Sequence, residues 1–381
     1  MENVVRVPCT IMRGGTSKAL FFRVADLPPP GSHRNDAIMA AMGSGDPRQI
    51  DGLGGADVLT SKVAIVGPSS RPDADVDYTF GQVGIQERVI DWSLNCGNIS
   101  SGVGVFAIQE SLVEAVEPVT TVRVHNTNTG KILTLRVQVS EGQPRVNGTY
   151  RIAGVPGSGS EIEMDFSETV GAMTGSLLPT GSVKDQLFVP GLERTIAVSI
   201  VDVANAAVFF HASEIGMRGS EGPEAFNEEV LGRFQAVQLA AAELSGISPE
   251  HGFPRPIAVA EPLSFRDFMT GELIDESEVD LLGRRVILPP PRLHKAFAAT
   301  GAVCTAVAAR LSGSIVNDVS RDPVDDLVRL GHPTGVFPVR ARVVNGEVKR
   351  ASFSRTARRL MDGEVVLRLP ADVLTVSAKT S

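Results

Sequence analysis

The sequence predicts an α/β (α+β) protein built from two similar halves. Strand-like stretches alternate with helix-like ones along the 381 residues, and short motifs of the first half recur in the same order in the second. Aromatic residues make up only 5% of the chain, whereas Val, Ala, Gly and Thr are common. A chain of this length usually exceeds a single hydrophobic core. We therefore expect two domains, residues 1–190 and 191–381, with the C-terminal strand able to return to the first.

The individual elements follow from periodicity. Runs rich in β-branched residues predict strands, and helical spacing of apolar residues predicts helices. The predicted strands span 60–66, 84–92, 120–124, 132–139, 195–203, 284–288 and 335–344, and the predicted helices span 35–42, 223–244 and 294–310. Clusters of Pro, Gly and Ser at 28–32, 67–72, 154–160 and 179–182 predict loops.

The two halves echo one another. ALFF at 19–22 recurs as AVFF at 207–210, KVAI at 62–65 as PIAV at 256–259, and GNIS at 97–100 as ATGA at 299–302. The spacing between the partners grows slowly and in order, as expected for two related units with small insertions. A duplication predicts a cleft on a pseudo-twofold axis, where equivalent loops of both halves meet one ligand.

Composition excludes several classes of partner. The formal charge of −8 argues against nucleic acid or an anionic membrane as the main partner, although a local pocket can still bind a small anion. Three scattered cysteines are too few for a disulfide framework. The start MENVVRVPCTIM lacks the pattern of a signal peptide, and no apolar run is long enough to span a membrane. We expect a soluble, cytoplasmic protein.

Two helix N-termini are candidate carboxylate sites. The helices expected at 98–108 and 300–310 begin at Asn98 and Thr300, which are good N-cap residues. Gly97 and Gly301 leave room for a ligand to approach the backbone. Free N–H groups and the positive end of the helix dipole suit carboxylates.

Cys96 is a candidate reactive thiol because it lies at the first of these N-termini, where the helix dipole favours a thiolate. Its neighbours Asn95, Gly97 and Asn98 are poor core residues. A small buried hydrophobe is the alternative. That alternative is the one we favour for Cys9 and Cys304, which lie in apolar segments.

Lys62 is a candidate base because it interrupts TSKVAIV, a segment otherwise suited to burial. A lysine leading into a buried strand is costly unless it is paired or neutral, and a neutral amine can accept a proton near pH 7. The alternative is a lysine at the strand end that extends to solvent.

Two further segments carry groups that could bind an anion. MRGGTSK at 12–18 is a glycine turn that contains Thr16 and Ser17, with a plain surface turn as the alternative. HKAFAATGAV places His294 and Lys295 just before the second helix N-terminus. GHPTG at 331–335 is a turn that could cover the cleft, and His332 in it is as easily structural as functional.

Five motifs together resemble one family. In order, they are MRGGTSKALFF, QIDGLGGADVLTSKVAIV, DVDYTFGQV, NCGNISSGVGVFAI and HKAFAATGAVCTAVA, and they resemble the PrpF family over about residues 5–345. The resemblance implies the diaminopimelate-epimerase-like fold, in which two pseudo-symmetric halves each wrap a β-sheet around a central helix and the active site lies in the cleft between them. Members include methylitaconate isomerase, 2-methylaconitate isomerase and 4-oxalomesaconate tautomerase, which move or rotate a C=C bond without a cofactor.

The resemblance also assigns roles. Lys62 and Cys96 match the catalytic lysine and cysteine of the family. Ser17, the loop from Asn95 to Asn98, and Thr300 with Gly301 match its carboxylate-binding elements. To the substrate-binding residues we add Thr16 and Lys295, and we expect neither cofactor nor metal.

One departure from the wider fold is informative. Racemases and epimerases of this superfamily use two facing cysteines, one from each half. Here the position that corresponds to Cys96 is Ala298, and that of Lys62 is Pro256. Two-thiol racemisation therefore lacks its second acid/base, and Cys304, further along the helix, would face elsewhere.

The expected reaction is a 1,3-allylic proton shift in an unsaturated di- or tricarboxylate. Neutral Lys62 would remove a proton next to the conjugated C=C bond, and Cys96 or Lys62 itself would return one at the other end. One motif, QIDGLGGADVLTSKVAIV, favours 4-oxalomesaconate. Another, FGQVGIQERVIDWSLNCGN, favours 2-methylaconitate or methylitaconate, so the substrate stays open. The oligomeric state is open as well, and a homodimer is compatible with the sequence.

Two other functions are weighed against this one. A non-catalytic accessory protein of an aconitase-like dehydratase would keep the carboxylate sites but need neither Lys62 nor Cys96. A cysteine hydrolase would need a histidine to activate Cys96, and the nearest in sequence is His125 in VHNTNTG. The presence of both Lys62 and Cys96 favours the isomerase.

Overall fold

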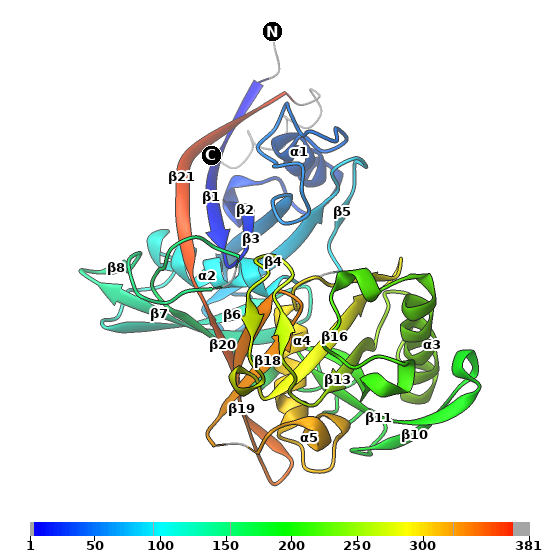
Figure 1. Ribbon diagram of the computed structural model, residues 1–381. Coiled ribbons are helices and arrows are strands. Elements are labelled where there is room, and N and C mark those ends of the chain that lie inside the picture. Colours follow the sequence, from blue (N-terminus) through cyan, green and yellow to red (C-terminus); the bar gives the residue numbers. More distant parts are fainter. Residues whose placement is uncertain (1–3, 94, 153, 323, 369–381) are drawn as a thin grey trace. The chain divides into compact units, whose positions relative to one another are not determined.

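The computed structural model describes residues 4–93, 95–152, 154–322 and 324–368. The chain forms two compact units (Figure 1). The first contains the chain up to Met164 and again from Ser354, and the second spans Asp165–Phe353. The division falls earlier than the predicted boundary at residue 190, because β10 (Asp185–Val189) pairs antiparallel with β11 of the second unit.

The first unit wraps strands around α2. Its elements are β1 (Val4–Gly14), β2 (Ser17–Arg23), α1 (Ser32–Met42), β3 (Lys62–Pro68), β4 (Val76–Val83), β5 (Ile90–Asp91), α2 (Gly97–Gln109), β6 (Val119–Asn126), β7 (Lys131–Ser140), β8 (Gln143–Pro144), β9 (Ile162–Asp165) and β21 (Ala357–Arg368). α2 packs against β1, β2, β7 and β21. Nearly all of its residues are buried, including its glycines and serines, because strands cover it on several sides.

The predicted return of the C-terminal strand is confirmed. β21 pairs antiparallel with β1 along almost the whole length of both strands, from Val4 opposite Arg368 to Gly14 opposite Ala357. Among the described residues, no helix is both long and apolar enough to cross a membrane.

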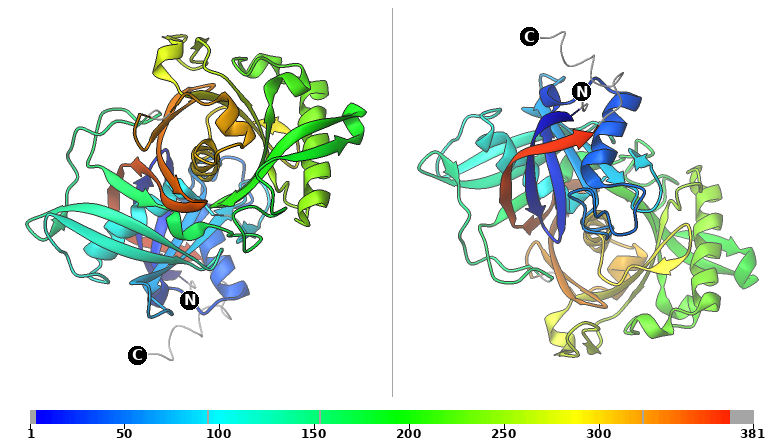
Figure 2. Two further views of the ribbon diagram at one scale, coloured as in Figure 1. Left: turned by 90° about the horizontal axis from the view of Figure 1, so that it is seen from below. Right: turned by 90° about the horizontal axis from the view of Figure 1, so that it is seen from above.

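The second unit repeats this arrangement around α4. Its elements are β10, β11 (Arg194–Val203), β12 (Asn205–His211), α3 (Glu228–Ser245), β13 (Arg255–Ala260), β14 (Phe265–Arg266), β15 (Leu273–Ile274), β16 (Leu281–Ile287), β17 (Arg292–Leu293), α4 (Ala299–Ala309), α5 (Ile315–Val319), β18 (Leu327–His332), β19 (Gly335–Val344) and β20 (Glu347–Arg355), which runs into the first unit. Viewed along its axis, α4 lies inside a ring of strands (Figure 2), and it packs against β11, β12, β18 and β19.

Strand pairing confirms the predicted duplication. In the first unit, β1–β2 is antiparallel, β2–β3 parallel, β3–β4 antiparallel, β4–β6 parallel and β6–β7 antiparallel. The series β11–β12–β13–β16–β18–β19 follows the same alternation in the second. α1 and α3 fill the first parallel crossover, and α2 and α4 fill the second.

The register corrects one predicted equivalence by a single residue. Leu20 pairs with Val63 in the first unit, and Val208 pairs with Pro256 in the second. With ALFF aligned on AVFF, Pro256 therefore matches Val63. The counterpart of Lys62 is Arg255, because a parallel pair keeps a constant offset along both strands.

Several predicted elements differ from those observed, and several observed strands were not predicted. Residues 84–92 contain only β5, because Gly84 and Val89 close a turn in which the Gly84 N–H donates to the Val89 carbonyl at 2.8 Å. Sequence analysis missed β4. α3 begins at Glu228, after Asn227 caps the Val230 N–H, rather than at residue 223.

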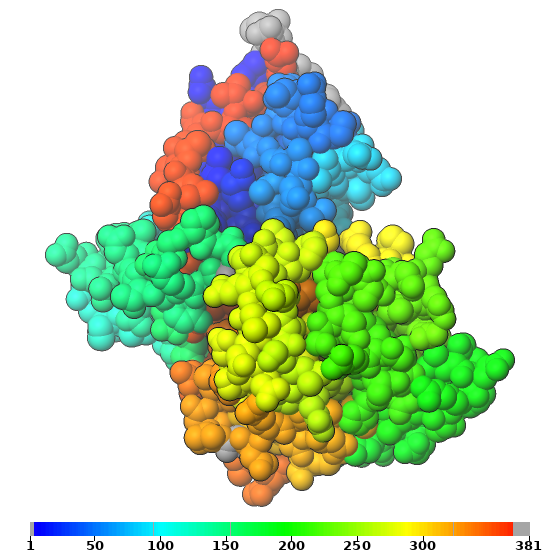
Figure 3. Space-filling model, in the orientation of Figure 1, coloured from blue at the N-terminus to red at the C-terminus, as the bar shows by residue number. Residues whose placement is uncertain are grey.

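The segment 43–61, which follows α1, lies at the surface of the first unit (Figure 3). Close to it lies a cavity of about 810 Å³, whose lining includes Asp36, Asp46, Asp51 and Arg88. None of the predicted site residues lines this cavity.

Candidate active site

No described side chain caps the N-terminus of α2, the central helix of the first unit. Cys96 is the N-cap residue, with extended backbone at φ −126°, and its own side chain caps nothing. The first intrahelical bond runs from the Ser100 N–H to the Cys96 carbonyl at 2.9 Å. Asn98 was the predicted N-cap, and this is wrong: it lies in the first turn because the helix begins one residue earlier, at Gly97.

A glycine turn holds Asn98 in place. The turn between β1 and β2 packs so closely on α2 that a Cβ atom on Gly15 would lie 2.2 Å from Asn98 Oδ1. Gly15 also has a φ of +52°, which only glycine adopts easily. The Asn98 amide donates to Thr16 Oγ1 at 3.0 Å, and Arg355 donates to Asn98 Oδ1 at 3.1 Å. Thr16 therefore accepts this bond and keeps its own hydroxyl proton to donate.

Ser17 and Lys62 begin neighbouring parallel strands and so lie at the same sheet edge. The Ser17 hydroxyl is buried and has no hydrogen-bond partner within the described residues. Lys62 is only 7% exposed. Its Nζ atom donates to Gln82 Oε1 at 2.5 Å and lies 5.3 Å from the centre of the Phe80 ring.

The surroundings of Lys62 are neutral. Gln82 is itself oriented by a bond from its amide to the Ser61 carbonyl at 2.8 Å. In the part of the chain that the structure describes, no carboxylate forms an ion pair with Lys62. The predicted burial of the lysine at the strand start is thus confirmed, and an amide with an aromatic ring takes the place of a counter-ion.

The turn at 126–129 anchors the segment that leads to Cys96. Asn126 donates to Asn95 Oδ1 at 3.1 Å, and Asn128 donates to the Trp92 carbonyl at 2.7 Å.

Tyr78 is completely buried, and its phenol oxygen has no hydrogen bond of normal geometry within the described residues. Burial, and then the nearby Cys96 thiol, raise the pKa of Tyr78 well above its usual value, so the phenol stays neutral.

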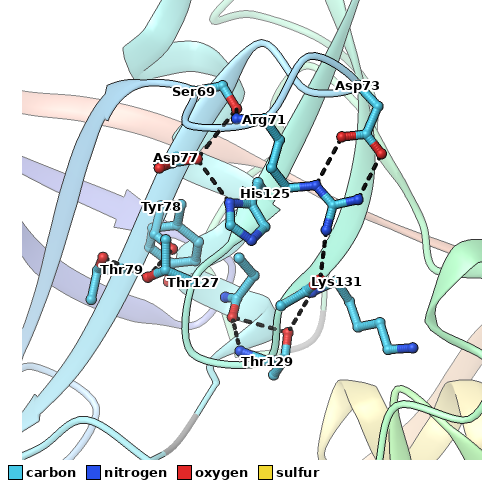
Figure 4. A network of polar contacts seen from close by, with 12 residues as sticks. Ser69, Arg71, Asp73, Asp77, Tyr78, Thr79, His125, Thr127, Thr129 and Lys131 are labelled. Atoms are coloured by element: carbon cyan, nitrogen blue, oxygen red, sulfur yellow. Dashed lines mark hydrogen bonds and ion pairs between the residues drawn. The ribbon is translucent and has the colours of Figure 1, made fainter. Parts of the chain in front are cut away.

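His125 belongs to a polar network that also includes Asp77 and Ser69 (Figure 4). Its Nδ1 atom lies 2.8 Å from Asp77 Oδ1, on the neighbouring strand β4. Burial raises the pKa of Asp77, but hydrogen bonds from His125 and Ser70 lower it by a larger amount, so the net effect is a lowered pKa. His125 is therefore held by a carboxylate, and nothing in this geometry supports its activating Cys96.

Cys9 and Cys304 are core residues, as expected. Cys9 is 3% exposed, and burial raises its pKa to about 12. Cys304 is fully buried, its pKa is raised chiefly by burial, and its thiol donates to the Val201 carbonyl. Cys96, in contrast, is partly exposed.

The second unit has an equivalent N-terminus at α4. Ala298 is the N-cap residue and Thr300 lies in the first turn, so the predicted N-cap at Thr300 is also wrong. Asn205 donates to Thr300 Oγ1 at 2.9 Å. In both units a bond therefore joins the hairpin to the first turn of the central helix. In the first unit the helix residue donates, and in the second the hairpin residue donates.

The residues just before α4 have different environments. Lys295 is exposed, with its ammonium 5.5 Å from the centre of the Phe268 ring. The His294 Nδ1 atom is buried without a partner among the described residues. Burial, and then the charge of Arg285, lower the pKa of His294 to about 4. His332 is buried beside Phe297 and Phe337 and bonds Thr334, which favours the structural interpretation.

Three buried arginines line the start of β13 and the strand β16. Arg255 donates to the Leu288 carbonyl at 2.9 Å, and Arg284 donates to the Glu221 carbonyl at 2.9 Å. Burial, the largest effect in each case, lowers the pKa of these two residues to about 10 and that of Arg285 to about 9. All three guanidinium groups remain protonated at neutral pH.

Comparison with known proteins identifies the family. The protein-family model described as "PrpF protein" matches residues 4–368, which is nearly the whole chain. The chain belongs to the PrpF family. Three PrpF relatives with names for their activity are 3-methylitaconate isomerase of Eubacterium barkeri, 4-oxalomesaconate tautomerase of Pseudomonas putida and 2-methyl-aconitate isomerase of Shewanella oneidensis. The isomerase of E. barkeri is 48% identical to this chain, and the match covers 96% of this chain and 98% of the relative. The tautomerase of P. putida is 38% identical, with 95% and 96% covered. The isomerase of S. oneidensis is 36% identical, with 96% and 98% covered.

Solved structures agree with this fold. A crystal structure of methylitaconate-delta-isomerase matches with a TM-score of 0.89 and 47% identity, covering 96% of each chain. A hydroxyproline epimerase from Agrobacterium vitis matches with a TM-score of 0.53 and 12% identity, covering 98% of this chain and 96% of its own. This second match shows that the PrpF fold is shared with an epimerase, and it says nothing about activity.

Several residues of the site were missed from the sequence. Asn126 and Asn128 stood in a motif considered only for its histidine, and their side-chain bonds across the turn were the overlooked signal. Arg355 reaches Asn98 from 257 residues away, so no local pattern could indicate it. Tyr78 lies in a strand that the sequence analysis did not predict.

Proposed function

We propose that this PrpF protein moves a C=C bond in an unsaturated di- or tricarboxylate without a cofactor, with Lys62 as the base. The observation that carries the proposal is the environment of Lys62: a buried amine beside a neutral amide and a ring, at the edge where Ser17 also begins its strand. A base with no counter-ion to hold its proton is suited to removing a weakly acidic C–H proton.

The reaction is a 1,3-allylic proton shift. The Lys62 amine removes a proton from the carbon next to the C=C bond, and the electron pair left behind spreads through the double bond onto the conjugated carboxylate. A proton then adds at the far end of the allyl system, and the double bond now lies one position along. No atom is gained or lost. The proton returns either from Lys62 or from the thiol of Cys96.

The uncapped N-terminus of α2 is suited to the charge that develops. The N–H groups of Gly97 and Asn98 have no side-chain cap, and the dipole of α2 places positive potential at this end. Thr16 keeps a hydroxyl proton to donate, and the unpartnered Ser17 hydroxyl is a further donor. We assign these residues, with Asn95, to binding one carboxylate. To a second carboxylate we assign Thr300 and Gly301 of α4, and Lys295.

Methylitaconate is the first substrate to test, since the E. barkeri relative named for it is 48% identical over 376 residues. The test is proton NMR in deuterated water with methylitaconate, 2-methylaconitate and 4-oxalomesaconate in turn. We expect one acid to show double-bond migration or cis–trans change, with deuterium entering an allylic carbon. A folded protein that leaves all three acids unchanged would contradict the proposal and favour a non-catalytic accessory role.

A further inference from the structure

The side chain of Arg285 is a buried cation that has no partner within the described part of the chain. Arg285 is 6% exposed, and its Nε and Nη1 atoms are completely buried with no hydrogen bond to any described residue. Arg255 is a neighbouring positive charge that repels it, and the neighbouring Cys304 thiol, which burial keeps neutral, supplies no negative charge. A buried guanidinium without hydrogen bonds is strongly unfavourable, so its presence calls for an anionic partner.

The other two buried arginines of this region differ in this respect. Arg255 stacks on Phe253 and donates to the carbonyls of Gly252 and Leu288. Arg284 donates to the carbonyls of Glu221, Gly283 and Gly331. Both therefore stabilise loops and strands of their own unit. Arg285 does neither, although it follows Arg284 directly in the same strand.

The guanidinium of Arg285 lies beside the first turn of α4. A Cβ atom on Gly301 would lie 3.4 Å from Arg285 Nη1 and 3.3 Å from the ring of Phe297. The helix has 11 residues, and no described side chain caps its N-terminus. Unpaired N–H donors at the helix end and an unpaired guanidinium thus meet at a glycine, beside an apolar wall that strengthens electrostatic attraction.

We propose that Arg285 and the N-terminus of α4 together bind one carboxylate of the substrate, the second carboxylate assigned above. Arg285 would then select acids that carry a carboxylate at this position. A guanidinium binds a carboxylate through two parallel hydrogen bonds, which a lysine cannot reproduce. Gly301 provides the space for the carboxylate. The identification of this carboxylate as the substrate's rests on the proposed function, whereas the anion site itself does not.

The test measures binding rather than turnover. Propane-1,2,3-tricarboxylate has no double bond to move, so its affinity can be titrated by calorimetry with the full chain. We expect Arg285→Gln to raise the dissociation constant about 10- to 100-fold, as for the loss of a charge-assisted hydrogen bond, and Arg285→Lys to restore only part of it. Arg255→Gln is the matched control: it removes a buried arginine of the same strand region and should change the affinity little.

Gly301→Ala is a second variant that does not depend on removing a charge. Alanine is favoured over glycine inside a helix, so the fold should be retained while the methyl group occupies the space beside Arg285. We expect weaker binding of the same probe. Equal affinity of wild type and Arg285→Gln, equal losses in Arg285→Gln and Arg255→Gln, or no binding to the wild type at millimolar concentration would each overturn the proposal.

These outcomes separate the inference from the proposed function. If the wild type shifts a double bond but Arg285→Gln binds the probe normally, the inference fails and the function stands. If no acid is isomerised but probe binding still depends on Arg285, the function fails and the carboxylate site stands.

Discussion

Cys96 and Ala298 occupy equivalent positions, since each is the N-cap residue of the central helix of its unit. Within the described residues neither helix has a side-chain cap, so both N-termini keep free N–H donors. The thiol, however, is present in the first unit alone. Cys304 does not replace it, because it is fully buried and its thiol is bonded to the Val201 carbonyl. The chain therefore lacks a pair of thiols at equivalent positions, and the duplicated fold is chemically asymmetric.

Replacement of Lys62 should remove the base and leave the fold intact. We expect Lys62→Ala to lower turnover about 10²- to 10⁴-fold, the usual contribution of a positioned acid or base. Turnover is followed by NMR, and folding by circular dichroism. Lys131→Ala, at the start of β7 in the same unit, is the control and should keep normal activity. Near-normal turnover in folded Lys62→Ala protein would show that another group takes the proton.

Cys96 should be the thiol that reacts first with iodoacetamide. It is partly exposed at a helix N-terminus, whereas Cys9 and Cys304 are buried and burial raises the pKa of both thiols. We expect mass spectrometry to find one modified site, and activity to fall in parallel. Cys96→Ser should lower turnover on the order of 10²-fold if the thiol transfers a proton. Full activity in Cys96→Ser would limit this residue to packing or binding.

Gly15→Ala should disturb the first turn of α2. The new methyl group would displace the Asn98 side chain, which lies 2.2 Å from the Cβ position, and so break its bonds to Thr16 and Arg355. We expect a loss of about 1–3 kcal/mol in the free energy of unfolding, together with weaker substrate binding. Gly142→Ala is the matched control, because Gly142 has a φ of +69° and open space around it. Equal losses in both variants would assign the effect to the backbone alone.

Stability should fall as the pH drops below about 6.5 because of His294. Burial, and then the charge of Arg285, lower its pKa from the usual 6.5 to about 4 in the folded protein, so the unfolded chain binds the proton more readily between these values. The contribution is fully present above pH 6.5 and is lost towards pH 4, by on the order of 3 kcal/mol. Urea unfolding at several pH values measures it. His294→Gln should flatten this part of the profile, and parallel profiles for the two proteins would contradict the assignment.

The sequence alone was sufficient for the duplication and for the main candidates. Strand periodicity and the ordered echoes predicted two similar units, because each unit must bury the same kind of helix under the same kind of sheet. Lys62 could be singled out because a lysine at the start of an apolar, buried strand is costly unless its charge is paired or removed. Cys96 could be singled out because its polar and glycine neighbours are atypical of a core.

The tertiary structure decided the contacts around these residues. Asn98 and Thr300 looked like N-caps, but each helix begins one residue earlier, and each of the two side chains bonds the distant hairpin of its own unit. The counterpart of Lys62 proved to be Arg255 because strand register depends on pairing between strands. Whether a buried arginine bonds a carbonyl, as Arg284 does, or stays unpaired, as Arg285 does, depends on which backbone groups lie around it. Only packing between distant segments determines those groups.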